Sequence, residues 1–107
     1  MQIKISSKHV QVTEAIEAYA SKKIEKFPRY FDRVSQVEVV IDREKPGYRV
    51  EIITDVDNHE AFVASSSHED LYACLDQTIG RSLRQLKDHK SRLRDNKHHT
   101  PTAGTDI

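Results

Sequence analysis

The sequence predicts a two-layer α/β sandwich, in which a four-stranded sheet has two helices packed on one face. Two observations support this fold class. The spacing of apolar residues alternates between the two-residue period of a strand and the 3.6-residue period of a helix, in the order β-α-β-β-β-α. The outward positions of two predicted strands are acidic, so one sheet face meets water and the apolar face needs the helices as cover. The 107 residues fit one domain.

A short strand and a helix come first. Residues 2–6 alternate, which places Ile3 and Ile5 on one face of a strand. Thr13 is a candidate helix N-cap, because its hydroxyl can accept a backbone N–H that the first helical turn leaves unpaired. The apolar residues that follow at helical spacing are Ile16, Ala20, Ile24 and Phe27. Pro28 lacks an N–H and should end or bend this helix near Phe27.

Three strands with alternating apolar and polar residues are predicted next, at residues 34–42, 48–55 and 59–66. In the first of them Val37 and Val39 face one way and Glu38 faces the other, which is typical of a half-buried strand. Turn signals at residues 45–47 and 57–58 separate the three strands. Short connections of this kind make neighbouring strands antiparallel.

The longest helical pattern covers residues 69–94. Ser67 is its candidate N-cap, and Glu69 and Asp70 are expected in the first turn, where the helix dipole favours negative charge. Gly80 inside this helix costs about 1 kcal/mol relative to Ala, and nothing in the sequence explains its presence.

After this helix, residues 96–107 lose the helical period and are predicted to form a flexible polar tail behind a single domain of residues 1–95. The chain has no apolar run that could cross a membrane, and its first residues lack the apolar stretch of a secretory signal. The one cysteine, Cys74, cannot form an internal disulfide and is interpreted as a structural helix residue. These features predict a cytoplasmic protein without a membrane partner.

Charge is unevenly distributed, although the chain has 17 basic and 17 acidic residues. Residues 34–76 carry ten acids against three bases. Residues 77–98 carry seven bases against two acids, and residues 19–33 carry five bases against two acids. If both helices cover the same sheet face, their bases share one side of the molecule and the acidic sheet surface occupies the other. A polyanion such as a nucleic acid would be attracted to the helical side. Charge alone leaves an ordinary solvated surface as the alternative.

No arrangement of residues indicates catalysis or metal binding. The six histidines lack partner cysteines and the four-residue spacing of helical metal ligands. Only three glycines are present, and they form no phosphate-binding loop. Cys74 has no evident activating base. The sequence therefore predicts a protein that is not an enzyme and uses no cofactor, no metal and no small-molecule substrate.

Three segments in order resemble one known family over residues 1 to about 95. They are Tyr30-Phe31-Asp32-Arg33 before the strand that starts at Val34, then residues 69–76 (EDLYACLD), then residues 84–90 (RQLKDHK). The chain is similar to the short ribosome hibernation promoting factors, also called ribosome-associated inhibitors or sigma-54 modulation proteins. This resemblance implies a fold similar in outline to double-stranded-RNA-binding domains. It also implies binding in the messenger and transfer RNA channel of the small ribosomal subunit, with inhibition of translation in idle cells.

Family members use helix bases against ribosomal RNA. The resemblance therefore implies these ribosomal-RNA-binding residues: Lys22, Lys23, Lys26, Arg81, Arg84, Lys87, Lys90 and Arg92. Asp88 departs from the pattern, because relatives commonly have a base there. The tail is too short for the second domain of long family members, so we do not expect the protein to dimerise ribosomes through such a domain. We expect it to be a monomer off the ribosome. The alternatives are a regulator that acts through a protein partner, as the sigma-54 name suggests, and a binder of free double-stranded RNA.

Overall fold

The computed structural model describes residues 1–98 and has the predicted order of elements, with one additional short helix. The elements are β1 (Gln2–Lys8), α1 (Glu14–Ile24), α2 (Phe27–Tyr30), β2 (Val34–Glu44), β3 (Gly47–Val56), β4 (Phe62–His68) and α3 (Leu71–His98). The four strands form one sheet in the order β1-β2-β3-β4. β1 is parallel to β2, and the other neighbours are antiparallel. The predicted fold class is confirmed.

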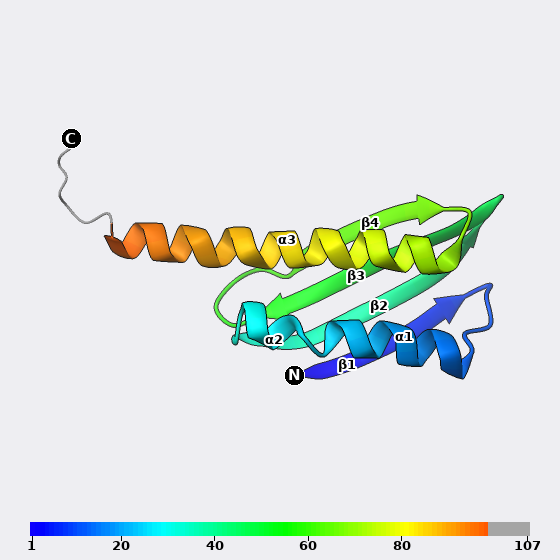
Figure 1. Cartoon of the computed structure of the whole chain (residues 1–107), viewed down its shortest axis with the longest axis horizontal. Helices are drawn as coiled ribbons and strands as arrows, with labels where there is room; N and C mark the ends of the chain where they lie inside the picture. Colours follow the sequence, from blue (N-terminus) through cyan, green and yellow to red (C-terminus); the bar gives the residue numbers. More distant parts are fainter. Residues whose placement is uncertain (99–107) are drawn as a thin grey trace.

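Both long helices lie on the same face of the sheet, with α1 near β1 and α3 along β3 and β4 (Figure 1). The predicted alternation is correct, because Val37, Val39 and Ile52 are fully buried under the helices. The register places Val39 opposite Ile52 and Ile52 opposite Ala64, so their side chains share the covered face. Ile24 and Leu75 complete this core from the two helices. Within residues 1–98, no helix has the length and apolarity needed to cross a membrane.

α1 begins as predicted but ends earlier. The hydroxyl of Thr13 accepts the N–H of Ile16 at 3.2 Å, which confirms the predicted N-cap. The helix ends at Ile24, not near Phe27. Pro28 explains the difference, because in a continued helix its ring would clash with the carbonyl of Ile24, four residues earlier, and it has no N–H to donate there. Pro28 instead lies in the first turn of α2, where a missing N–H costs nothing.

The start of α3 corrects the predicted cap. β4 continues to His68, which pairs with Tyr48, so Ser67 belongs to the strand and donates to Glu44 Oε1 at 2.7 Å. The cap is Asp70, whose Oδ2 accepts the N–H of Ala73 at 3.3 Å. Glu69 and Asp70 therefore precede the helix and do not lie in its first turn.

Other boundaries also differ from the predictions. β2 extends to Glu44, and β4 covers residues 62–68 instead of 59–66, because the connection after β3 includes Asn58 with a positive φ of 60°. α3 continues through His98, so residues 96–98 are helical and do not belong to the predicted tail. The remainder of that tail, residues 99–107, lies outside the described residues.

α3 is long enough to need two separate anchors on the sheet. Its 28 residues span about 42 Å, and its last turns extend beyond the sheet (Figure 1). Near its start, the buried thiol of Cys74 donates to the carbonyl of Ser66 at 3.2 Å, as expected for a structural cysteine. Farther along, His89 is only 8% exposed and packs edge-on against Phe31 and Phe62, with ring centroids 5.2 Å apart in both pairs. The ring of His59 lies 4.5 Å from that of His89.

The same substitution should have opposite effects at two glycines. A Cβ at Gly47 would overlap the carbonyl oxygen of His68, whereas a Cβ at Gly80 would have no atom within 4 Å. We expect Gly47→Ala to lower the free energy of unfolding by about 2 kcal/mol, because backbone must move. Gly80→Ala should raise it by roughly 0.5–1 kcal/mol, because Ala is the better helix former. Denaturant unfolding measures both; a neutral Gly47→Ala would contradict the close packing at this strand end.

The second anchor of α3 should make stability sensitive to mild acid. Burial lowers the pKa of His89 below the usual 6.5, and the neighbouring positive charges of His59 and Arg92 lower it further. Protonation therefore favours the unfolded chain, so this contribution is complete above about pH 6.5 and is lost as the pH falls below it. We expect the denaturant midpoint to fall between about pH 7.5 and pH 5.5, and to fall less in His89→Phe. An equal fall in both proteins would show that His89 is not responsible.

Candidate nucleic-acid interface

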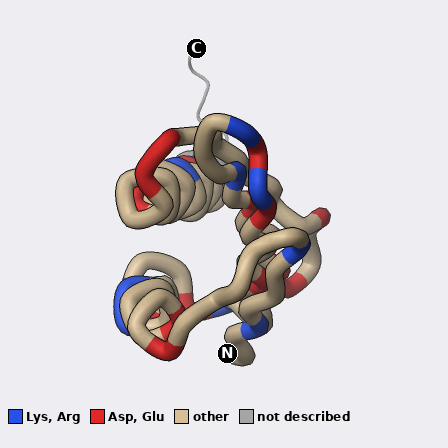
Figure 2. Tube along the Cα trace, turned by 90° about the vertical axis from the view of Figure 1, so that its right-hand side faces the viewer, with Lys and Arg blue, Asp and Glu red and all other residues tan. Residues whose placement is uncertain are grey.

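A groove lies between the α1–α2 segment and α3 on the helical side of the molecule. It has a volume of about 320 Å³. Its lining residues are Lys23, Lys26, Tyr30, Asp76, Ile79, Gly80 and Leu83. We call this feature the interhelical groove. Figure 2 views the molecule end-on and shows α3 above α1 at the left, with the strands of the sheet at the right, so both helices lie on one side of the sheet.

Polar and aromatic contacts between α1 and α3 close one end of the groove. Asp76 Oδ1 accepts a hydrogen bond from the hydroxyl of Tyr19 at 2.8 Å and one from Nζ of Lys23 at 2.7 Å. The rings of Tyr19 and Tyr72 meet edge-on, with centroids 4.9 Å apart. The hydrogen bond from Lys23 lowers the pKa of Asp76, and the same bond raises the pKa of Lys23. Both groups therefore remain charged at neutral pH.

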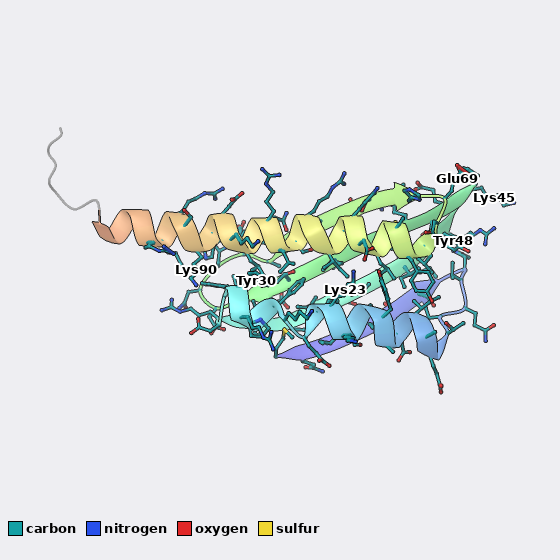
Figure 3. The ribbon with its side chains drawn as sticks, viewed as in Figure 1. Lys23, Tyr30, Lys45, Tyr48, Glu69 and Lys90 are labelled. Atoms are coloured by element: carbon teal, nitrogen blue, oxygen red, sulfur yellow. The ribbon has the colours of Figure 1, made fainter. Side chains whose placement is uncertain are left out.

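A cation and an aromatic ring mark the other end. Nζ of Lys87 on α3 lies 4.9 Å from the ring centroid of Tyr30 on α2. Lys26, in the turn between α1 and α2, is exposed and lines the groove between its two ends. Figure 3 shows Lys23 and Tyr30 between the two helices, and Lys90 on the side of α3 that faces α2. The groove thus has cationic side chains from both helical segments along its rim.

The remaining bases of α3 lie on its other flank, beside the edge strand β4. The guanidinium of Arg81 donates to the carbonyl of Ser65, and Nε2 of Gln85 donates to the carbonyl of Val63 at 2.9 Å. These bonds satisfy two carbonyls of β4 that no further strand can pair. Arg84 lies beside them in a shallow depression, and Arg92 follows Arg81 after about three helical turns. Arg81 therefore has a structural role at the sheet edge.

The predicted binding residues are thus brought together only in part. Four of them lie at or beside the interhelical groove: Lys23, Lys26, Lys87 and Lys90. Arg81, Arg84 and Arg92 lie on the β4 flank, and Lys22 is exposed on α1, away from the sheet. Asp88 shares the depression with Arg81 and Arg84, so its negative charge lies on the β4 flank and not in the groove.

Five groove residues were missed as site residues by reasoning from the sequence: Tyr30, Asp76, Ile79, Gly80 and Leu83. Tyr30 and Asp76 lie within the segments that carry the family resemblance, but no local pattern showed that they face each other across a groove. Gly80 did carry a signal, because glycine is unfavourable inside a helix and the sequence offers no local reason for it.

The outer sheet face is less acidic than predicted. Glu38 and Asp42 on β2 lie there, but β1 places Lys4 opposite Glu38 and Lys8 opposite Asp42. His9 adds a contact of 3.2 Å to Asp42, and this hydrogen bond lowers the pKa of Asp42. Bases therefore lie beside the acids of β2, whereas Glu51 and Asp55 of β3 lie opposite uncharged residues. In the described part of the chain, no three His, Cys, Asp or Glu side chains are grouped to hold a metal ion.

Known proteins match this sequence over almost the whole of the described chain. Residues 3–94 match the family described as "Sigma 54 modulation protein / S30EA ribosomal protein". The ribosome hibernation promoting factor of Pseudomonas putida KT2440 is 36% identical over 92 residues, which cover 86% of this chain and 89% of the relative. The protein of the same name from Escherichia coli K12 is 36% identical over 94 residues, which cover 88% of this chain and 98% of the relative.

Two solved structures share the fold. A ribosomal subunit interface protein from Coxiella burnetii superimposes with a TM-score of 0.79 at 19% identity, covering 85% of this chain and 99% of that one. The N-terminal domain of Thermus thermophilus Protein Y gives a TM-score of 0.75 at 28% identity, covering 83% of this chain and 99% of that one.

Proposed function

The chain belongs to the sigma 54 modulation protein / S30EA ribosomal protein family, which includes the ribosome hibernation promoting factors, and from this premise we propose that it binds the small ribosomal subunit and holds idle ribosomes inactive. Members of this family are non-enzymatic ribosome-binding proteins. We place the binding in the messenger and transfer RNA channel of the small subunit, through contacts to ribosomal RNA. The protein acts in the cytoplasm and is a monomer off the ribosome.

One observation carries the RNA-binding part of this proposal. Lys26 in the α1–α2 turn and Lys87 on α3 are 61 positions apart in the sequence, yet both lie at one groove. A cluster assembled from two helical segments concentrates positive potential more than bases spread over one helix. Contacts from such lysines would go mainly to phosphates, which fix the position of the protein without reading base sequence.

On this proposal, the protein inhibits translation simply by occupying the messenger and transfer RNA channel. A folded domain in the channel excludes messenger and transfer RNA, because two molecules cannot fill the same volume. The sheet supports this role, since it holds α1 and α3 at a fixed separation through a core that includes Ile24, Leu75 and Val39. Phosphate contacts release counterions that were condensed on the RNA. The free energy gained from this release becomes smaller as the salt concentration rises, so binding that depends on phosphate contacts must weaken.

The proposal is tested with two variants of equal net charge. Lys26→Gln, Lys87→Gln and Lys90→Gln together remove three groove cations, whereas Lys4→Gln, Lys8→Gln and Arg49→Gln remove three from the outer sheet face. In co-sedimentation with purified small subunits, we expect the groove variant to bind at least about tenfold more weakly and with a shallower salt dependence. The sheet variant should bind and inhibit translation in vitro like the wild type.

Two outcomes would contradict the proposal. Equal weakening of both variants would show that only net charge matters and that the groove is not the binding surface. If the folded wild type stays in the supernatant at low salt, ribosome binding fails. The alternative then is a regulator that acts through a protein partner, which would not depend on the helix bases.

A further inference from the structure

Gly80 lines the interhelical groove, and the packing of the fold does not explain why this residue is a glycine. It is exposed on α3, and a Cβ at this position would have no atom within 4 Å. Packing therefore does not require glycine, and helix propensity disfavours it. A residue that is costly for the helix and unnecessary for the core is explained if a ligand approaches the backbone there.

The groove has the chemistry of a site for a nucleobase, which differs from that of a site for a phosphate backbone alone. Ile79 and Leu83 contribute apolar side chains to its lining, and Tyr30 contributes an aromatic ring. A phosphate needs only cations, and apolar side chains do not help to bind it. A base has a flat apolar face and polar edges, and it stacks on aromatic and apolar side chains. The volume of about 320 Å³ is at the lower limit of small-ligand sites, which span roughly 300–1,000 Å³.

The charged side chains at the two ends of the groove predict the orientation of a bound nucleotide. At the closed end Asp76 is ionised and is paired with Lys23, so this end offers no net attraction to a phosphate. Lys26 and, beside Tyr30, Lys87 have no such partner among the described ion pairs. A phosphate is therefore favoured at the Tyr30 end, and the N–H edge of a base is favoured near the carboxylate of Asp76.

We propose that the interhelical groove takes one unpaired RNA nucleotide, with its base lying over Gly80 against Ile79, Leu83 and Tyr30, and its phosphate toward Lys26 and Lys87. This inference rests on the proposed function for the identity of the partner as ribosomal RNA. It adds that the protein recognises RNA whose bases are out of a helix, because a paired base cannot leave the stack to enter the groove without an energetic cost. A duplex touches the rim cations only.

The decisive variant is Gly80→Leu, which fills the groove without changing charge. The variant should fold, since the space at Gly80 is open and leucine is a good helix former. Its matched control is Gln77→Leu, which adds the same side chain at an exposed position of α3 outside the groove-lining set. Unfolding by denaturant is the control for folding, and we expect both variants to be as stable as the wild type or more so.

The first measurement uses the isolated, isotope-labelled protein and does not involve ribosomes. The probes are an eight-nucleotide unstructured RNA, the same sequence in a duplex, and an eight-unit abasic RNA strand of equal charge. We expect the unstructured RNA to shift the Gly80 amide resonance and to bind roughly ten- to a hundredfold more tightly than the abasic strand. Gly80→Leu should lose this preference for a strand with bases, and Gln77→Leu should keep it. Equal binding of all three probes by the wild type would overturn the proposal.

The second measurement uses small ribosomal subunits, with chemical probing of the Watson–Crick edges of ribosomal RNA bases. At saturation, wild type and Gln77→Leu should protect an unpaired base that stays reactive when Gly80→Leu is bound. Identical protection by all three proteins would overturn the base-binding inference and leave the proposed ribosome binding intact. Failure of the wild type to bind subunits, combined with a preference for single-stranded RNA, would reject the proposed function and keep the groove as a nucleotide site.

Discussion

The apolar face of a single sheet has to be covered by two helices, and most features of this protein depend on that constraint. Each helix packs on the sheet through its own apolar residues, such as Ile24 on α1 and Leu75 on α3, so the sheet sets the separation between them. The helices meet through long side chains at the Tyr19–Asp76–Lys23 contacts and through Lys87 over Tyr30. The groove between these two points is a consequence of how the core is covered.

The two flanks of α3 have different tasks as a result. Its inner flank faces the groove, where Gly80 leaves open space and Lys87 contacts Tyr30. Its outer flank lies along β4, where Arg81 and Gln85 occupy backbone carbonyls of an edge strand that would otherwise be free to pair with another chain. A basic residue on a helix is therefore not automatically a ligand-binding residue. Arg81 shows that a guanidinium suited to RNA can be engaged in closing the protein's own sheet.

The length of α3 links stability to the proposed activity. The helix extends beyond the sheet, and its second half is held by His89 among Phe31, Phe62 and His59. Lys87 and Lys90 lie within two residues of this anchor, so their positions depend on it. This anchor consists of aromatic contacts around an uncharged imidazole. Burial disfavours the charged form of His89, so protonation in acid weakens the anchor.

The sequence by itself determined the four strands and the two long helices, their order and the face that each one buries, but not the short helix α2. Thr13 at the first cap and the alternation of Val37 and Val39 were readable because they depend only on residues a few positions apart. Tertiary structure decided where elements end and which side chains meet: pairing of His68 with Tyr48 moved the α3 cap to Asp70. Lys23 and Asp76 are 53 positions apart, and the contact between them follows from the sheet order and helix spacing. Local periodicity encodes burial, whereas a groove exists only once two distant segments have packed on the same sheet.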